Sequence, residues 1–318
     1  MRPSLTLMLA AAMLAVATMP AIADSAVIVM YHRFGEDSYP STNVRIDQFE
    51  AHIRELAEGP YTVLPVSEIA AALRSGKKLP DRTVGITVDD AYLSVYTEAW
   101  PRLKAAGLPF TLFVATDAVD KRFGGMVDWD QIREMRGAGV EIGAHTASHL
   151  HMADAPGKVN RAEMQRSLKR LQEELGAKPV LFAYPYGEAS LATQAIVKEF
   201  GFEIAFGQHS GAAHGASDLM YLPRFALNEK YSALEDFILR VNTLPLPVSD
   251  VSPLDSFIRD KNPPLVGFTV DASIGSLRGL ACYHSQFGKA DLEILGTHRV
   301  EIRFPEPFRV GRFGAVQP

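Results

Sequence analysis

The chain contains 318 residues, of which 47% are hydrophobic, and its formal net charge is −5. This length and apolar content are sufficient for a large buried core, which excludes a disordered or fibrous protein. The mildly acidic balance and the lack of any dense block of lysine and arginine exclude nucleic acid as a partner. Cys282 is the single cysteine, so an intramolecular disulfide is excluded and we expect Cys282 to be a small core residue.

The first 23 residues have the features of an export signal. Arg2 precedes an apolar run from Leu5 to about Ala17, and the small-x-small sequence that ends at Ala23 suits signal peptidase. The run is shorter than the roughly 20 apolar residues that a membrane span needs, and no later run is long enough. We therefore expect cleavage after Ala23, export to the periplasm or the medium, and no membrane span in the mature chain.

Short apolar, β-branched runs alternate with segments of helical spacing from Ala26 to about Leu244. The runs predict strands at Ala26–Met30, Val84–Val88, Phe110–Val114, Val140–Gly143, Val180–Ala183 and Phe202–Phe206. The intervening segments predict helices at Asp47–Glu58, Ser67–Arg74, Trp129–Arg136, Asn160–Leu175 and Leu191–Phe200. Asn160 and Glu163 have the spacing of a capping box, which predicts that the fourth of these helices begins there. The alternation favours a parallel sheet or a (β/α) barrel.

The alternation ends after about Leu244. Residues 246–262 are rich in proline and turn formers, so we expect a linker there. Beyond it, four runs predict short antiparallel strands: Leu265–Val270, Leu280–His284, Leu292–Ile294 and His298–Phe304. We therefore expect an α/β domain over residues 24–245 and a small β-rich domain over residues 263–318, which either binds a ligand or covers an edge of the first domain.

Polar residues follow several predicted strands directly. His32 ends the run VIVMYH, Asp89 and Asp90 end VGITVDD, His145 ends VEIGAH, and a Pro-Tyr-Gly turn follows VLFA. Sites in α/β barrels assemble at the carboxyl ends of the strands, so these residues are expected at one rim. Nearby rings at Tyr92, Trp129 and Tyr184 are interpreted as packing residues, because aromatic side chains dominate cores.

Two adjacent carboxylates at the end of an apolar strand need compensation by a metal or by hydrogen bonds. Neighbouring strand residues face opposite ways, so Asp89 and Asp90 are expected to do different work unless the backbone turns between them. One would bind a metal and the other would act as a base, although Asp90 could equally cap a helix that starts at Ala91.

His145 and His149 would face a common point if the chain enters a helical turn after the strand, whereas His151 lies off that face. One aspartate and two histidines leave positions open for water and substrate, as in a catalytic rather than a structural metal site. Zinc is the first expectation, and cobalt or nickel would also suit these ligands.

The sequence resembles the polysaccharide deacetylases, carbohydrate esterase family four with the NodB-homology fold. TVDDAY is similar to the T-F-D-D-G motif, HTASH to H-[ST]-x-x-H, and FAYPYG to F-R-x-P-Y-G, in family order between about Ala26 and Leu244. VIVMYHRF and the alanine at Ala183 resemble the exported, biofilm-type branch, which acts on poly-N-acetylglucosamine.

The resemblance implies a distorted (β/α)7-type barrel with a small C-terminal β-rich appendage. It also implies that Asp89 is the general base, that Asp90, His145 and His149 hold the metal, and that the backbone N–H of Tyr186 contributes to the oxyanion hole. Water activated by the metal would attack an acetyl carbonyl, and Asp89 would take its proton.

The sequence departs from the family pattern at three places. Ala91 replaces the usual glycine, the base-orienting arginine is absent at Ala183, and no convincing L-x-H motif supplies an acid. We expect His32 to be the acid, with His209 and His214 as weaker alternatives. Arg224 either orients Asp89 or forms a surface ion pair.

Several functions stay open at this level. The resemblance favours removal of N-acetyl groups from an exported polysaccharide, and the alternatives within enzymes are an O-acetyl esterase on an exopolysaccharide and a peptidoglycan deacetylase. A carbohydrate-binding protein with weak catalysis is the alternative of another class, against which the complete set of Asp89, Asp90, His145 and His149 argues. No protein partner is indicated.

Overall fold

The computed structural model describes residues 25–259, 261–309 and 316–317. The expected export signal, residues 1–23, lies outside them. None of the helices in the described ranges combines the length and apolar character that crossing a bilayer requires.

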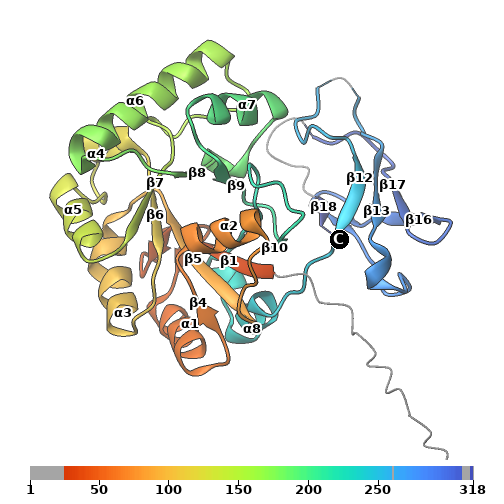
Figure 1. The fold of residues 1–318 in the computed structure, drawn as a ribbon, viewed down its shortest axis with the longest axis horizontal. Helices are drawn as coiled ribbons and strands as arrows, with labels where there is room; N and C mark the ends of the chain where they lie inside the picture. The colour runs from red at the N-terminus through yellow and green to blue at the C-terminus, as the bar shows by residue number, and fades with distance from the viewer. Residues whose placement is uncertain (1–24, 260, 310–315, 318) are drawn as a thin grey trace, which may run out of the picture.

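The main sheet is parallel over most of its width and curls into a half-barrel (Figure 1). Its strands are, in spatial order, β10 (Ala212–His214), β1 (Ser25–Tyr31), β5 (Thr83–Asp89), β6 (Thr111–Val114), β7 (Glu141–Ala144), β8 (Leu181–Ala183) and β9 (Ile204–Phe206). The short strands β11 (Phe225–Ala226) and β4 (Thr62–Val63) pair in parallel with β1 and β5, and only β10 runs antiparallel. The distorted barrel is therefore confirmed, and all six predicted strands are present.

Helices surround the outside of the curled sheet, except for the helix Val66–Ser75, which packs with the residues of its inner face (Figure 1). They are α1 (Ile46–Glu58), α2 (Val66–Ser75), α3 (Trp100–Ala105), α4 (Thr116–Asp120), α5 (Trp129–Gly137), α6 (Gly157–Leu175), α7 (Leu191–Glu199) and α8 (Leu234–Val241). The five predicted helices correspond to α1, α2, α5, α6 and α7. The sequence did not reveal α3, α4 and α8, which are short.

The start of α6 differs from the prediction. The helix begins at Gly157 with Pro156 as its N-cap residue, so Asn160 and Glu163 lie inside it and form no capping box. Both side chains are buried and contact the loop that precedes the helix. The local pattern was misleading because tertiary contacts, rather than the helix end, use these polar groups.

Alternation along the strands separates two faces of the sheet. Val27 and Val29 of β1 belong to the cluster that packs under the outer helices, whereas Ala26 and Ile28 belong to a second cluster on the inner face. In β5 the residues Val84, Ile86 and Val88 face the first cluster. The period of two therefore directs Thr87 and Asp89 to the inner face.

The C-terminal strands lie to one side of the barrel (Figure 1). One antiparallel sheet has the order β12 (Val248–Ser252), β13 (Val266–Val270), β17 (Arg299–Arg303) and β16 (Asp291–Leu295). A second contains β15 (Gly288–Lys289), β14 (Tyr283–His284) and β18 (Val316–Gln317). Strand β12 lies within residues 246–262, where a linker was expected, because an exposed edge strand beside prolines has no alternating apolar pattern. Cys282 is fully buried in the core of this region.

Candidate active site

The candidate residues gather at the carboxyl ends of neighbouring parallel strands. His32 follows β1, Asp89 ends β5, His145 follows β7, and Tyr186 lies in the turn after β8. Of the eight non-glycine residues with positive φ in the described ranges, five lie in these loops, namely Asp90, Ala91, Thr146, His149 and Tyr186. Backbone held in this sparsely populated region is typical of functional sites.

The backbone turns sharply between the two aspartates. Asp90 has φ 75° and Ala91 has φ 63°, so Asp90 leaves the strand alternation that fixes Asp89. This left-handed turn explains why a glycine is usual at the position of Ala91, since glycine adopts it without steric cost. Ala91 is fully buried there. The turn lets both carboxylates approach the same rim from different sides.

Asp90, His145 and His149 converge on one point, with ligand atoms that all lie within 4.8 Å of one another. Oδ1 of Asp90 is 3.4 Å from Nε2 of His145 and 3.2 Å from Nε2 of His149. Nδ1 of His145 lies 2.7 Å from the carbonyl oxygen of Ala183. Because that carbonyl can only accept, Nδ1 carries the proton and Nε2 presents a lone pair.

This arrangement suits a cation. Oδ1 of Asp90 and Nε2 of His145 are buried without a hydrogen-bond partner among the described residues, and two lone pairs that face each other repel unless a positive charge lies between them. Burial lowers the pKa of His145, but the facing carboxylates of Asp90 and Asp89 outweigh it and raise that pKa. The carbonyl of Ala183 orients the ring as in known metal-bound histidines. The donor set therefore fits a divalent transition metal.

Asp89 is held by Arg224 inside the barrel. The guanidinium donates to both carboxylate oxygens at 2.8 Å, and neither side chain is exposed. Arg224 also donates to the Gly207 carbonyl at 2.8 Å and to Oγ1 of Thr87 at 3.2 Å. Burial would raise the pKa of Asp89, but the charges of Arg224 and His145 outweigh it and hold the pKa below its usual range. The surface ion pair considered for Arg224 is therefore absent.

The remaining candidates differ in their placement. His32 is half-buried and lies near enough to Asp90 and Asp89 for their charges to oppose the lowering of its pKa by burial. His209 is exposed beside the ring of Tyr221 at 4.6 Å between ring centroids. His214 lies in β10 opposite Ser25, at the amino end of β1. His214 is therefore remote from the rim.

Tyr186 lies between two histidines. It has φ 60° in the Pro185–Gly187 turn, and its ring centroid is 4.3 Å from that of His149 and 3.7 Å from that of His151. Nδ1 of His151 lies 2.9 Å from Glu188, and neither residue was assigned a role from the sequence. The only signal for this contact was the proximity of His151 to the HTASH motif.

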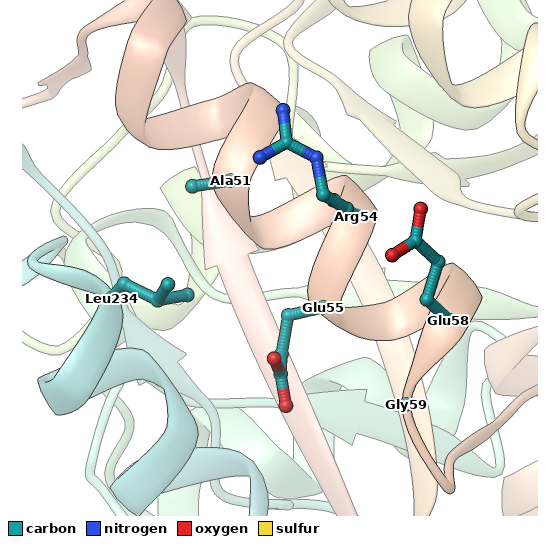
Figure 2. A pocket seen from close by; sticks show the side chains of 6 residues that line it. All are labelled: Ala51, Arg54, Glu55, Glu58, Gly59 and Leu234. Atoms are coloured by element: carbon teal, nitrogen blue, oxygen red, sulfur yellow. The ribbon is translucent and has the colours of Figure 1, made fainter.

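The other aromatic residues differ in their surroundings. Trp129 and Tyr184 are buried core residues, as interpreted from the sequence. Tyr92 is half-buried, and the guanidinium of Arg33 lies 3.4 Å from its ring centroid. A pocket between α1 and the start of α8 is lined by Ala51, Arg54, Glu55, Glu58, Gly59 and Leu234 and shares no residue with the rim (Figure 2).

Residues 76–205 match the family model for polysaccharide deacetylase. This region is a polysaccharide deacetylase domain. An Escherichia coli poly-beta-1,6-N-acetyl-D-glucosamine N-deacetylase is 30% identical over 64% of this chain and 36% of its own length. A Staphylococcus aureus protein with the same activity in its name is 27% identical over 62% of this chain and 71% of its own. The chain thus spans about a third of the length of the E. coli relative.

The fold of the domain is shared with solved deacetylases. IcaB from Ammonifex degensii has a TM-score of 0.62 and 26% identity, over 69% of this chain and 98% of that one. The Streptococcus pyogenes deacetylase PplD has a TM-score of 0.64 at 23% identity, over 69% and 99% of the two chains, and shows likeness of fold. Both matches leave the rest of this chain uncovered.

Proposed function

We propose that this protein is an exported, metal-dependent deacetylase that removes N-acetyl groups from a poly-N-acetylglucosamine-like polysaccharide. The observation that carries the proposal is the convergence of Asp90, His145 and His149 beside the Arg224–Asp89 pair. The names of the E. coli and S. aureus relatives support the choice of an N-acetylated glucosamine polymer. Residues 24–245 would carry the reaction, and export is supported by the features of residues 1–23.

Asp90, His145 and His149 would hold the metal, zinc by preference and cobalt or nickel as alternatives. When bound, such a cation polarises an acetyl carbonyl and makes a coordinated water more acidic. Nε2 of His145 is already oriented for this role by the Ala183 carbonyl, and Asp90 contributes the single negative charge of the triad. The three side chains leave room in the coordination shell for water and substrate.

Asp89 would accept the proton of the attacking water. The two bonds from Arg224 keep the carboxylate ionised and fix its plane. Each oxygen retains a further lone pair for the water, because Arg224 uses only one on each. Arg224 therefore takes the place of the base-orienting arginine that is missing at Ala183.

His32 and Tyr186 would complete the reaction. His32 would give a proton to the departing amine, since it is the imidazole outside the triad that lies near both carboxylates. The backbone N–H of Tyr186 would donate to the oxyanion that forms on the acetyl carbonyl. This role is supported by the position of Tyr186, which has a left-handed backbone and a ring centroid 4.3 Å from that of the triad member His149.

The test is acetate release from β-1,6-linked N-acetylglucosamine oligomers by the purified mature chain, residues 24–318. Chelation should abolish release and added zinc or cobalt should restore it. Asp89→Asn should lower turnover by roughly 10²–10⁴-fold, the usual contribution of a general base. Asp81→Asn is the matched control, because Asp81 is exposed and lies at the opposite end of β5. His32→Ala tests the acid, and near-normal turnover would remove it from the mechanism.

Two other results would change the proposal. Metal binding without release from these oligomers, but with release from acetyl esters or from peptidoglycan, would move the substrate to one of the alternative polymers. A protein that binds glycan yet binds no metal would be a carbohydrate-binding protein.

A further inference from the structure

The loop between β7 and α6, residues 145–156, carries both imidazoles of the metal triad. Its backbone enters the left-handed region at Thr146, with φ 60°, and at His149, with φ 57°. Residues with a Cβ adopt this conformation only where their surroundings hold them in it. The position of the His149 ring therefore depends on the contacts that hold the loop.

Backbone groups of α4 hold the first part of the loop. The N–H of Asp117 donates to the carbonyl of Ala147 at 2.8 Å, and the N–H of Thr116 donates to that of Thr146 at 3.4 Å. Oγ1 of Thr146 accepts from the N–H of Leu150 at 3.3 Å. None of these bonds is made by an atom of Ser148, which joins Ala147 to His149.

Side chains of α6 hold the second part. Oε2 of Glu163 accepts from the backbone N–H of Ser148 at 2.7 Å and from its hydroxyl at 2.9 Å. Asn160 donates to the carbonyl of Met152 at 2.8 Å. Asn160 and Glu163, which have the spacing of a capping box in the sequence, thus contact the loop that carries the metal ligands. The residue that Glu163 contacts, Ser148, directly precedes His149.

Glu163 is bound on both of its oxygens. The residue is only 7% exposed, and a carboxylate with so little access to water needs compensating partners. Ser148 supplies two donors to Oε2, and the guanidinium of Arg166 pairs with Oε1. Arg166 also lies 3.3 Å from the carboxylate of Asp117 on α4. The two helices that contact the loop, α4 and α6, are therefore connected through the charges of Asp117, Glu163 and Arg166.

We infer that Glu163 is a positioning residue for the metal ligand His149. By fixing Ser148, it keeps His149 in its left-handed conformation, so that the imidazole faces Asp90 and His145. The inference rests on the proposed metal site, and it adds a residue that touches neither metal nor substrate. Removal of such an outer contact typically weakens metal binding by about 10–100-fold.

The test is the zinc affinity of the metal-stripped mature chain, measured by competition with a chromophoric chelator. Glu163→Ala should weaken zinc binding by about 10-fold or more. Glu163→Gln keeps an oxygen for Ser148 but loses the charge that faces Arg166. Its zinc affinity should therefore lie between that of the wild type and that of Glu163→Ala. Glu173→Ala is the matched control, because Glu173 is an exposed residue of the same helix, and it should bind zinc as the wild type does.

Thermal unfolding of the stripped proteins separates positioning from general stability. A lower midpoint for Glu163→Ala with unchanged zinc affinity would overturn the inference. If that variant does not fold, Ser148→Ala removes only the hydroxyl donor and should weaken zinc binding by a smaller factor, so unchanged affinity there would also overturn it. Wild-type protein that binds no zinc would overturn the proposed function as well, whereas equal affinity of wild type and Glu163→Ala would overturn this inference alone.

Discussion

Two sets of arginine–carboxylate contacts, one in the barrel and one in the C-terminal sheet, have similar lengths but different surroundings. Arg224 contacts Asp89 through two bonds of 2.8 Å, and neither side chain is exposed. In β17, Glu301 is 2.7 Å from Arg299 and 3.0 Å from Arg303, whose side chains are 28% and 52% exposed. In both places the arginines hold the pKa of the carboxyl below its usual value, at Asp89 against the opposing effect of burial.

The difference lies in what can replace a lost partner. Water can solvate Glu301 if an arginine leaves, and exposed pairs of this kind contribute about 0–1 kcal/mol. Asp89 has no contact with solvent, and removal of one partner from a buried pair costs about 3–5 kcal/mol. Burial, rather than the bond length, therefore decides which arginine the fold depends on.

Arg224→Met is expected to have the largest effect. The substitution leaves the Asp89 carboxylate in the barrel interior without the guanidinium of Arg224. We therefore expect the free energy of unfolding to fall by about 3–5 kcal/mol. Urea unfolding of the metal-stripped protein measures this loss without any contribution from zinc.

A double variant sharpens the result. Arg224→Met combined with Asp89→Leu removes both charges, and apolar replacement of a whole buried pair is often close to neutral for stability. We therefore expect the double variant to recover most of the lost free energy. A loss below about 1 kcal/mol for the single variant would place Arg224 with the exposed pairs, against the comparison above.

A buried histidine of the outer helix α1 should make stability depend on pH. Nδ1 of His52 lies 3.0 Å from the hydroxyl of Tyr31, and its Nε2 lies 3.1 Å from the Ser232 carbonyl. Its ring stacks on Phe237 with 3.9 Å between centroids. Burial and, less strongly, the charge of Arg240 lower the pKa of His52 to about 4, although the Ser232 carbonyl opposes the shift.

The sign follows from the two pKa values. The unfolded chain protonates His52 near its ordinary pKa of 6.5, whereas the folded chain resists protonation down to about 4. The stabilisation is therefore complete above pH 6.5 and is lost as the pH falls from 6.5 to 4, by about 3 kcal/mol in total. Urea unfolding at several pH values measures it. The free energy of unfolding is plotted against pH for wild type and for His52→Leu, and the difference between the two slopes isolates the contribution of this histidine. Identical slopes would contradict the prediction.

The contact between the two regions should have a smaller effect. Oγ of Ser256, in the segment after β12, donates to the carbonyl of Ala189 at 2.7 Å, close to the turn that carries Tyr186. Ser256→Ala removes one partly buried hydrogen bond, which contributes about 1 kcal/mol. We expect the thermal midpoint to fall by roughly 2 °C. Ser249→Ala, on the exposed strand β12, is the control and should leave the midpoint unchanged.

The sequence predicted the elements whose pattern is set by burial. Six strands with continuous apolar runs were found, and the polar residues after several of them indicated which rim would carry the site. Asp89, Asp90 and His145 lie at that rim because strand ends are brought together by parallel pairing. Arg224 could be suggested as a partner of Asp89, but only the fold shows that it lies inside the barrel.

The features that escaped prediction depend on contacts between distant segments. Asn160 and Glu163 had the spacing of a helix cap, yet their partners are Met152 and Ser148 in the preceding loop. Strand β12 is almost wholly exposed, so it lacks the apolar alternation on which strand prediction relies. Local patterns report burial well, and they do not report which polar group a side chain will meet.

Arg303→Met should have the smallest effect of these substitutions. Arg303 is 52% exposed, and Glu301 keeps its contact with Arg299 when Arg303 is removed. We expect the free energy of unfolding to fall by less than about 1 kcal/mol, and 0.5 M NaCl should reduce even that difference, because salt screens exposed charges. The same arginine-to-methionine change is thus made at two sites, and urea unfolding compares them directly. A loss at Arg303 as large as that at Arg224 would mean that contact geometry, rather than burial, decides how much these pairs contribute.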